Sequence, residues 1–167
     1  YHRDGGDVKV LNMSRNFGVT PCVLAGLEHA KGDLVIYMDA DLQDPPEVIP
    51  QMIQSWSEDA QVEVVHTIRS SREGEARLKL ALTRLGYLVL KSISSVPIRI
   101  EAGDFKLLSR RTVNEIVRMK EKNPFMRGMV AWVGFKQAEV FYRREARRGG
   151  ETKFPVLSVK VMRNFLD

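Results

Sequence analysis

The stretch LVIYMDADLQDPPE, residues 34–47, begins with a short apolar run, and three aspartates and two prolines come directly after it. Its apolar start predicts a buried strand, and Pro45-Pro46 predicts the end of that strand and the start of a helix. Asp39 and Asp41 form a D-x-D pair, and alternate residues of an extended chain point to the same side. With the oxygen of Gln43, the pair suits a hard divalent cation that also keeps phosphate oxygens as ligands. The alternative is a solvated acidic turn in which Asp44 only supplies charge at a helix start. We favour the metal because the motif follows a buried strand.

The segments on both sides predict an alternation of strands and helices. Residues 8–13 alternate apolar and polar side chains, as a half-buried strand does. Thr20 and Pro21 predict the N-cap and first turn of a helix that ends before Gly32. A helix over residues 47–56 and a strand over residues 62–70 follow. This order predicts right-handed βαβ crossovers in an α/β fold with a mostly parallel sheet, whose ligands bind beyond the carboxyl ends of the strands.

The second half of the chain is less regular. Residues 74–94 predict a long helix, residues 103–119 a short strand running into a helix, and residues 123–134 another helical piece. Residues 137–145 alternate like an edge strand, and a basic glycine-containing loop follows over residues 146–154. We find no internal repeat or low-complexity linker. We therefore expect residues 1–167 to be one domain.

Composition limits the class of protein. The chain has 167 residues, of which 44% are hydrophobic and 28% charged, so the composition is that of a folded domain rather than a disordered one. A single cysteine, Cys22, excludes an internal disulfide framework, and we expect a small buried thiol there. No run of 18 or more uncharged apolar residues occurs. The net charge of +5 indicates an anionic partner, such as a phosphate-bearing substrate, a membrane surface or nucleic acid.

Five motifs, taken together, resemble one enzyme family. They are SRNFG, DADLQDPPE, AGDFKLLSRR, FMRGMVAWVGF and RRGGETKF, starting at residues 14, 39, 102, 125 and 147. Their order and spacing resemble those of family 2 glycosyltransferases that charge polyprenyl phosphates, the bactoprenol (undecaprenyl-phosphate) glucosyltransferases most and the dolichol-phosphate mannosyltransferases next. The resemblance covers essentially the whole chain.

The resemblance implies a GT-A-like nucleotide-sugar-binding sandwich that uses Mg²⁺ or Mn²⁺. It further implies sugar transfer, with inversion at the anomeric carbon, from a nucleotide-sugar donor to a polyprenyl-phosphate acceptor. UDP-glucose is the first expectation for the donor. On this analogy Asp39 binds the ribose or sugar side of the donor, while Asp41 and Gln43 ligate the metal.

A phosphate acceptor changes what the site needs. A phosphate monoester oxygen is already anionic near neutral pH, so positioning and charge neutralisation matter more than a general base. Asp104 occupies the place of the family's acid near the acceptor, where it would orient the acceptor or a sugar hydroxyl. The alternative is that Asp104 satisfies a local backbone turn.

Arginine and lysine side chains are the candidate phosphate ligands. Arg69, at the carboxyl end of a predicted strand, is our first choice for the acceptor phosphate, with help from Arg84. Arg127 and Lys153 are candidates for contact with the donor diphosphate or the acceptor. Trp132 is a candidate wall of the sugar or lipid pocket, although a tryptophan among apolar residues is usually core.

The predicted helix over residues 74–94 is amphipathic. Leu78, Leu82 and Leu85 belong to an apolar stripe that continues to residue 93, and Arg77, Arg84 and Lys91 line another side. A cationic amphipathic helix can rest in the headgroup layer of an anionic membrane. The alternative is a helix packed on the domain with its charges in water. A polyprenyl acceptor favours the membrane and, with it, the cytoplasmic face of the cell membrane.

The chain also departs from the family pattern. The N-terminal strands that hold the nucleotide base in the family do not precede Tyr1, and the transmembrane helices that commonly follow do not appear after Asp167. We therefore expect an internal fragment of a family 2 catalytic domain. The family can assemble through its catalytic and membrane segments, so the resemblance also allows a homo-oligomer.

Two other functions compete with this interpretation. One is a family 2 transferase with a soluble or polysaccharide acceptor, which would need Asp104 as a catalytic base. The other is a non-enzymatic basic module that binds anionic lipid or nucleic acid through residues 143–153. Few aromatic side chains are interleaved with that charge run, so we expect no nucleic-acid partner.

Overall fold

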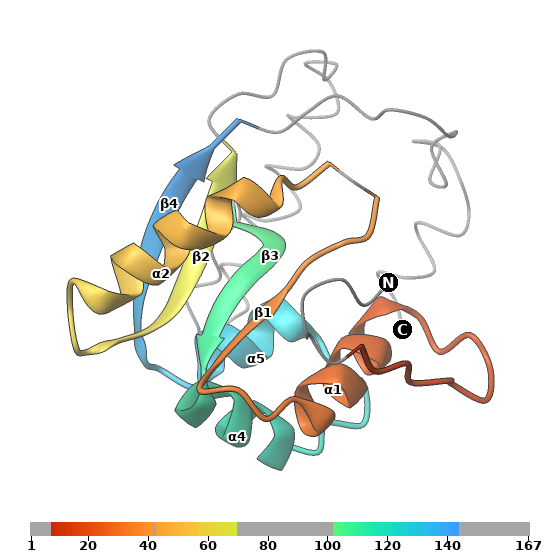
Figure 1. Cartoon of the computed structure of the whole chain (residues 1–167). Helices are drawn as coiled ribbons and strands as arrows, with labels where there is room; N and C mark the ends of the chain where they lie inside the picture. Colours follow the sequence, from red (N-terminus) through yellow and green to blue (C-terminus); the bar gives the residue numbers. More distant parts are fainter. Residues whose placement is uncertain (1–7, 42, 70–101, 144–167) are drawn as a thin grey trace, which may run out of the picture.

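The computed structural model describes residues 8–41, 43–69 and 102–143 (Figure 1). In chain order, these ranges contain helix α1 (Val19–His29), strand β1 (Leu34–Tyr37), the 3₁₀ turn η1 (Pro46–Val48), helix α2 (Ile49–Ser57), strand β2 (Val62–Arg69), strand β3 (Ala102–Ser109), helix α4 (Arg110–Arg118), helix α5 (Met126–Trp132) and strand β4 (Lys136–Tyr142). Within them, no helix combines the length and the apolar character that a bilayer crossing would need.

The four strands form one mixed sheet in the order β1-β3-β2-β4. Strand β3 lies between β1 and β2 and runs antiparallel to both, whereas β2 and β4 are parallel. The expected α/β class is therefore confirmed, but the sheet is mixed rather than mostly parallel in its pairing. Strands β1, β2 and β4 still point the same way. The one reversed strand comes from the second half of the chain, where periodicity predicts a strand but not its place between two earlier ones.

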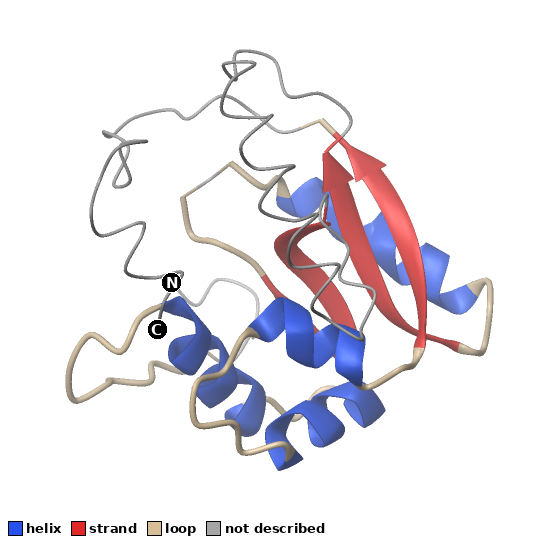
Figure 2. Cartoon of the chain, turned by 180° about the vertical axis from the view of Figure 1, so that it is seen from behind, coloured by secondary structure: helices blue, strands red, loops and turns tan. Residues whose placement is uncertain are grey.

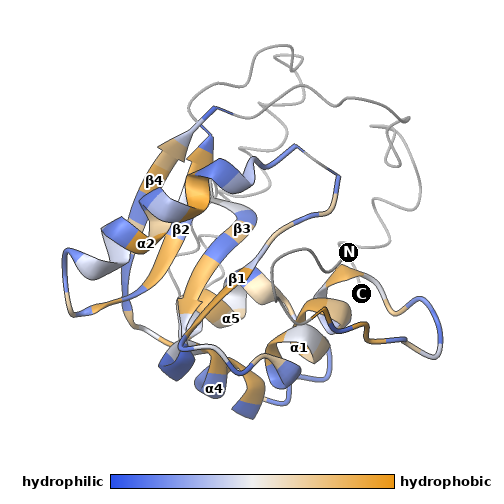
Figure 3. Ribbon diagram, viewed as in Figure 1, coloured by the Kyte–Doolittle hydropathy of each residue, from blue (hydrophilic) through white to orange (hydrophobic). Residues whose placement is uncertain are grey.

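Helices cover both faces of the sheet. Helix α2 packs on one face, and α1, α4 and α5 gather on the other (Figure 2). Consecutive residues of β3 serve the two layers, since Leu107 packs toward α2 and Leu108 packs toward the other three helices. Apolar residues run along β2 and β3, while hydrophilic residues colour much of α4 (Figure 3).

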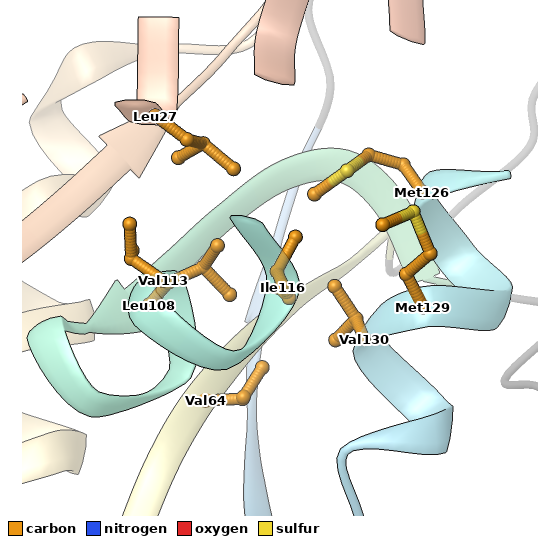
Figure 4. Close-up of a cluster of buried hydrophobic side chains, with 8 residues drawn as sticks. All are labelled: Leu27, Val64, Leu108, Val113, Ile116, Met126, Met129 and Val130. Carbon is orange, nitrogen blue, oxygen red and sulfur yellow. The ribbon is translucent and has the colours of Figure 1, made fainter. Parts of the chain in front are cut away.

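The layer with α1, α4 and α5 packs on the sheet through a hydrophobic core. Its members come from three helices and two strands, and their side chains converge in Figure 4: Leu27, Val64, Leu108, Val113, Ile116, Met126, Met129 and Val130. Leu108 and Ile116 are fully buried there. This core fixes α5 against the sheet and so fixes the position of the side chains that α5 carries.

Local chemistry explains where several helices begin. Helix α4 follows β3 directly because Ser109 is its N-cap and accepts a 3.1 Å hydrogen bond from the backbone N–H of Thr112. Helix α2 begins through the turn at Pro46 and keeps Pro50 in its first turn, as predicted. Helix α1 begins two residues earlier than predicted, since its N-cap is Gly18, with φ of 88°, and not Thr20.

Two predictions are wrong. Residues 8–13 form no strand: Val8 and Val10 are 65% and 77% exposed, so the alternating pattern finds no partner strand in the described structure. Cys22 is exposed rather than buried, because α1 turns that position away from the sheet. The predicted helix over residues 74–94 and the segment after residue 143 lie outside the described residues.

Candidate functional site

Several of the predicted site residues lie together at one end of the strands, which is called this edge of the sheet below. Strands β1 and β2 end at this edge and the reversed strand β3 begins there, so residues 38–39, Arg69 and residues 103–104 are neighbours. The β1–β3 register pairs Tyr37 with Lys106, and continuing it by two residues places Asp39 opposite Asp104. The expectation that ligands bind beyond the carboxyl ends of strands leads to the same edge.

A cavity of about 300 Å³ opens between this edge and helices α1 and α5. Charged residues from three elements line it, namely Asp39, Asp104 and Arg127, together with the ring of Tyr37. Apolar and neutral side chains line the remaining wall: Val19, Thr20, Val23, Met38, Phe125 and Met126. A cavity with charged groups on one side and apolar groups on the other suits an amphiphilic or sugar-bearing ligand.

Asp104 and Arg127 form a bidentate ion pair. The Nε and Nη2 atoms of Arg127 donate to the two carboxylate oxygens of Asp104 at 3.1 and 3.0 Å. Burial disfavours the charged carboxylate, but Arg127, followed by Lys106 and Arg69, outweighs this effect and lowers the pKa of Asp104 below its ordinary value. Asp104 is therefore ionised at neutral pH and a weak proton acceptor.

Lys106 lies beneath this pair, inside the sheet. Its Nζ atom is 3.7 Å from Oδ1 of Asp104, donates to the carbonyl oxygen of Gly103, and lies 5.7 Å from the centre of the Tyr37 ring. Burial lowers the pKa of Lys106 to about 8, and the Asp104 carboxylate opposes that change. Burial, with a smaller contribution from Asp104, raises the pKa of Tyr37.

Arg69 ends β2 beside the start of β3. A methyl group built on Gly103 would lie 3.7 Å from Nη2 of Arg69, so the guanidinium passes over this glycine. The Nε atom of Arg69 is buried and has no hydrogen-bond partner in the described structure. Three cations, Arg127, Lys106 and Arg69, thus act on the carboxylate of Asp104, and Asp39 is the other carboxylate that lines this cavity.

The D-x-D loop is held from both ends. Oδ1 of Asp41 accepts a 3.2 Å hydrogen bond from the backbone N–H of Gln43, which folds the loop back on itself. Asp44 is 2% exposed and accepts a hydrogen bond from the Tyr142 hydroxyl of β4, so it anchors the loop rather than only supplying charge to a helix. Burial, followed by the bond to Asp44, raises the pKa of Tyr142.

Oxygen ligands for a divalent metal are present but few. The described residues contain no cluster of three or more His, Cys, Asp or Glu side chains able to hold a metal ion. Asp41 and Gln43, partly buried in the same folded loop, fit a cation that takes its other ligands from phosphate and water.

The remaining candidates are not gathered at the cavity. Trp132 ends α5 with 67% of its surface exposed, and it is neither in the core nor in the cavity lining. Arg84 and Lys153 lie outside the described residues. Among the residues at the cavity and beneath it, sequence reasoning missed Tyr37 and Lys106. A lysine within an apolar strand, two residues after an acid, was the available signal for Lys106.

Comparison with known proteins identifies the family of this chain. The sequence profile of Glycosyl transferase family 2 matches residues 1–117, which include Asp39, Asp41, Arg69 and Asp104. The chain belongs to glycosyl transferase family 2. The family recognised from the motifs is thereby confirmed, and the α/β architecture is that of a GT-A-like family 2 glycosyltransferase.

Individual family 2 glycosyltransferases are similar over most of the chain. An uncharacterized glycosyltransferase of Bacillus subtilis, YkcC, is 46% identical over 149 residues, which cover 89% of this chain and 46% of that protein. A prophage bactoprenol glucosyl transferase homolog of Escherichia coli is 44% identical over 144 residues, covering 86% of this chain and 46% of that protein. The chain thus spans about half the length of the curated relatives that it matches.

A solved structure also resembles this family 2 chain. The crystal structure of glucosyl-3-phosphoglycerate synthase from Mycobacterium tuberculosis in complex with Mn²⁺ and UDP-glucose matches with a TM-score of 0.48 and 17% identity. The match covers 86% of this chain and 51% of that one.

Proposed function

We propose that this chain is part of an inverting glycosyltransferase that moves a sugar from a nucleotide-sugar to a polyprenyl phosphate. The observation that carries the proposal is the three cations around Asp104, which outnumber the Asp104 and Asp39 carboxylates beside a cavity that is also lined by apolar side chains. A phosphate acceptor would balance the remaining positive charge. Similarity to proteins named bactoprenol glucosyl transferase supports this acceptor, and we take UDP-glucose as the first donor to test.

The proposed reaction is a single displacement. An anionic oxygen of the acceptor phosphate forms a bond to the anomeric carbon, and the bond from that carbon to the donor diphosphate breaks. The nucleoside diphosphate leaves with the electron pair, and the anomeric configuration inverts. The nucleophile carries no proton, so the reaction needs no general base.

The state of Asp104 supports a phosphate acceptor over a hydroxyl acceptor. An efficient general base has a pKa near the working pH. Asp104 has a lowered pKa and both of its oxygens are engaged by Arg127, so it suits orientation of a ligand better than removal of a proton. A soluble or polysaccharide acceptor would require Asp104 to act as a general base, with a pKa near the working pH.

We assign roles to the side chains as follows. Arg69 binds the acceptor phosphate and Arg127 exchanges between Asp104 and a ligand anion. Asp39 faces the ribose or sugar side of the donor. Asp41 and Gln43 would hold Mg²⁺ or Mn²⁺, which would neutralise charge on the leaving diphosphate. We keep Arg84 and Lys153 as further phosphate ligands, and Trp132 as a lipid or sugar contact.

Calorimetric titration with UDP and GDP tests the donor site. We expect one nucleotide to bind in Mn²⁺ and to lose at least tenfold in affinity with chelator or in Asp41→Asn, because Asp41 would help to hold the cation that neutralises the diphosphate. Asp59→Asn is the matched control, since Asp59 is an exposed carboxylate paired with Lys136. Affinity in Asp41→Asn or in chelator that equals the affinity of the unsubstituted protein in Mn²⁺ would contradict the metal assignment.

We also propose that the protein works at the cytoplasmic membrane face, where residues 74–94 contact anionic lipid. Sedimentation with vesicles rich in anionic lipid tests this. Leu82→Glu/Leu85→Glu should abolish vesicle binding, because two charges enter the apolar stripe. Charge reversal on the basic side of this predicted helix, Arg77→Glu/Arg84→Glu, should weaken vesicle binding and make the remaining binding insensitive to salt. Unchanged sedimentation of the leucine variant would rule the contact out.

A further inference from the structure

Lys106 is the one lysine or arginine among the described residues whose side chain is buried. Only 1% of it is exposed, and it lies in the middle of β3, which has a neighbouring strand on each side. Tyr37 of β1 and His66 of β2 are its register partners. A buried ammonium group is costly unless it is paired and hydrogen-bonded, so this position calls for an explanation.

The polar contacts of the Lys106 ammonium given above are with the start of β3. Its Nζ atom donates to the carbonyl oxygen of Gly103 and lies 3.7 Å from Oδ1 of Asp104. Lys106 therefore touches both the backbone that carries Asp104 and the carboxylate itself. It does not line the cavity, whereas Asp104 and Arg127 do.

The two cations that contact Asp104 differ in their access to a ligand. The Arg127 side chain is 25% exposed and borders the cavity, while the Lys106 ammonium is sealed inside the sheet. An incoming anion can compete for Arg127 but cannot reach Lys106. Removal of Arg127 from Asp104 would leave a carboxylate without a counter-ion unless another cation stayed in place.

We propose that Lys106 is a positioning residue that serves as the permanent counter-ion of Asp104, so that Arg127 is free to turn from Asp104 to a bound anion. Lys106 keeps the carboxylate ionised and aimed at the cavity through this exchange. The electrostatics of Lys106 support this pairing, because the Asp104 carboxylate favours the ammonium form of Lys106 and so opposes the effect of burial.

Other charged or titratable groups also face Asp104 and must be considered in any titration. They come from every element at this edge of the sheet: Tyr37 of β1, Asp39 after β1, Arg69 of β2 and Arg127 of α5. Lys106 is the only one of the cations that approaches from within the sheet, so its removal can be separated from theirs.

Titration of the Asp104 carboxyl carbon by NMR, on protein labelled at aspartate, tests the proposal. In Lys106→Met we expect an upward shift of the Asp104 pKa relative to the unsubstituted protein, because one counter-ion has gone. The matched control is Lys136→Met, which removes an exposed lysine 2.6 Å from Asp59. It should move the titration of Asp59 and leave that of Asp104 unchanged. Superimposable Asp104 curves in folded Lys106→Met would overturn the proposal.

A second comparison tests the division of roles between the two cations. Arg127→Met should raise the Asp104 pKa, and Arg127→Met/Lys106→Met should raise it further. Equal pKa values in these two variants would show that Lys106 is no counter-ion.

A third measurement leaves the buried lysine in place. In Asp104→Asn, the pKa of the Lys106 ammonium, followed on labelled lysine, should fall further, because the carboxylate that favours the ammonium is absent. An unchanged Lys106 titration would refute the pairing even if Lys106→Met failed to fold. The coupling between two titrating groups is reciprocal, so both directions must agree.

The importance of this pairing for sugar transfer rests on the proposed function, but the titrations need neither donor nor acceptor. If they fail while UDP binding holds, Lys106 has only a structural role. If UDP binding fails while the titrations hold, the charge pairing stands and the assignment of UDP-glucose as the donor does not.

Discussion

At the scale of single residues, the site depends on which carboxylates are buried and which face solvent. Asp44 is 2% exposed and is bound by Tyr142, whereas the Asp104 side chain is 42% exposed and meets cations from inside and outside the sheet. The first arrangement fixes a loop, and the second keeps a charge available to a ligand. The two acids therefore have different roles: Asp44 lies in the segment after β1, and Asp104 lies near the start of β3.

The buried ammonium of Lys106 makes the stability of the protein depend on pH in a defined window. Its pKa is about 8 in the folded state and 10.5 ordinarily. Below pH 8 both states hold the proton and the full cost of burial is present. Between pH 8 and 10.5 the unfolded state binds the proton that the folded state has released, so the contribution of this group to stability rises with pH.

Urea unfolding of the protein and of Lys106→Met, measured from pH 7 to about 10.5, checks this expectation. The difference in unfolding free energy should move in favour of the unsubstituted protein as pH rises through the window. Curves that stay parallel would mean that the lysine keeps its ordinary pKa. Lys136→Met again serves as the control for loss of an exposed lysine.

At the scale of elements, helices were more predictable than strand pairing. Pro21, Pro46 and Ser109 carry local signals that predict where helices begin, although the cap of α1 is Gly18. The strand predicted over residues 8–13 did not form, because an alternating pattern indicates a strand only where a partner exists. The place of β3 between β1 and β2 depends on contacts between distant segments, which periodicity does not encode.

The same distinction applies to the candidate site. The D-x-D, AGDF and FMRG motifs carried enough information to select Asp39, Asp104 and Arg127 as candidates, which the fold brings to one cavity. Tyr37 and Lys106 were missed because their types, an aromatic residue and a lysine within strands, are ordinary when read one at a time. Only the register that pairs them across β1 and β3 shows that they belong together.

Helix α5 offers a test at the element scale. A methyl group on Gly128 would lie 2.9 Å from Cδ1 of Phe125, so Gly128→Ala should push the ring out of the cavity wall. Phe125 is 48% exposed and can move, while alanine favours a helix over glycine by about 1 kcal/mol. We expect unchanged or higher thermal stability together with weaker binding of UDP or acceptor.

The control is Gly26→Ala in helix α1, where a methyl group meets nothing within 4 Å. This variant should gain stability without loss of binding. Equal ligand affinity in Gly128→Ala and Gly26→Ala would show that the Phe125 ring takes no part in the site.

At the scale of the whole molecule, the sheet separates two helical layers that serve different purposes. Helices α1 and α5 of one layer contribute to the wall of the cavity, and the layer with α2 lies on the opposite face of the sheet (Figures 1 and 2). Leu107 and Leu108 are both fully buried but belong to opposite layers. Adjacent residues of one strand therefore report on the two layers independently.

Leu107→Ala and Leu108→Ala should each lower the free energy of unfolding by about 2–5 kcal/mol, since each leaves a cavity in a closely packed core. Hydrogen exchange should then separate them. Leu108→Ala should lose protection mainly in α4 and α5, and Leu107→Ala mainly in α2. Identical exchange patterns would show that the two layers unfold as one unit.

The reversed central strand also sets the order in which the molecule can assemble as it is made. Strand β1 and strand β2 leave the ribosome first, but residue 34 must wait for residue 109 before its pairing partner exists. Until then both early strands have unpaired backbone, which attracts other chains. Pairing over such a distance along the chain also slows folding. The nascent protein therefore passes through a stage in which its first half needs shielding, and that stage ends when β3 is synthesised.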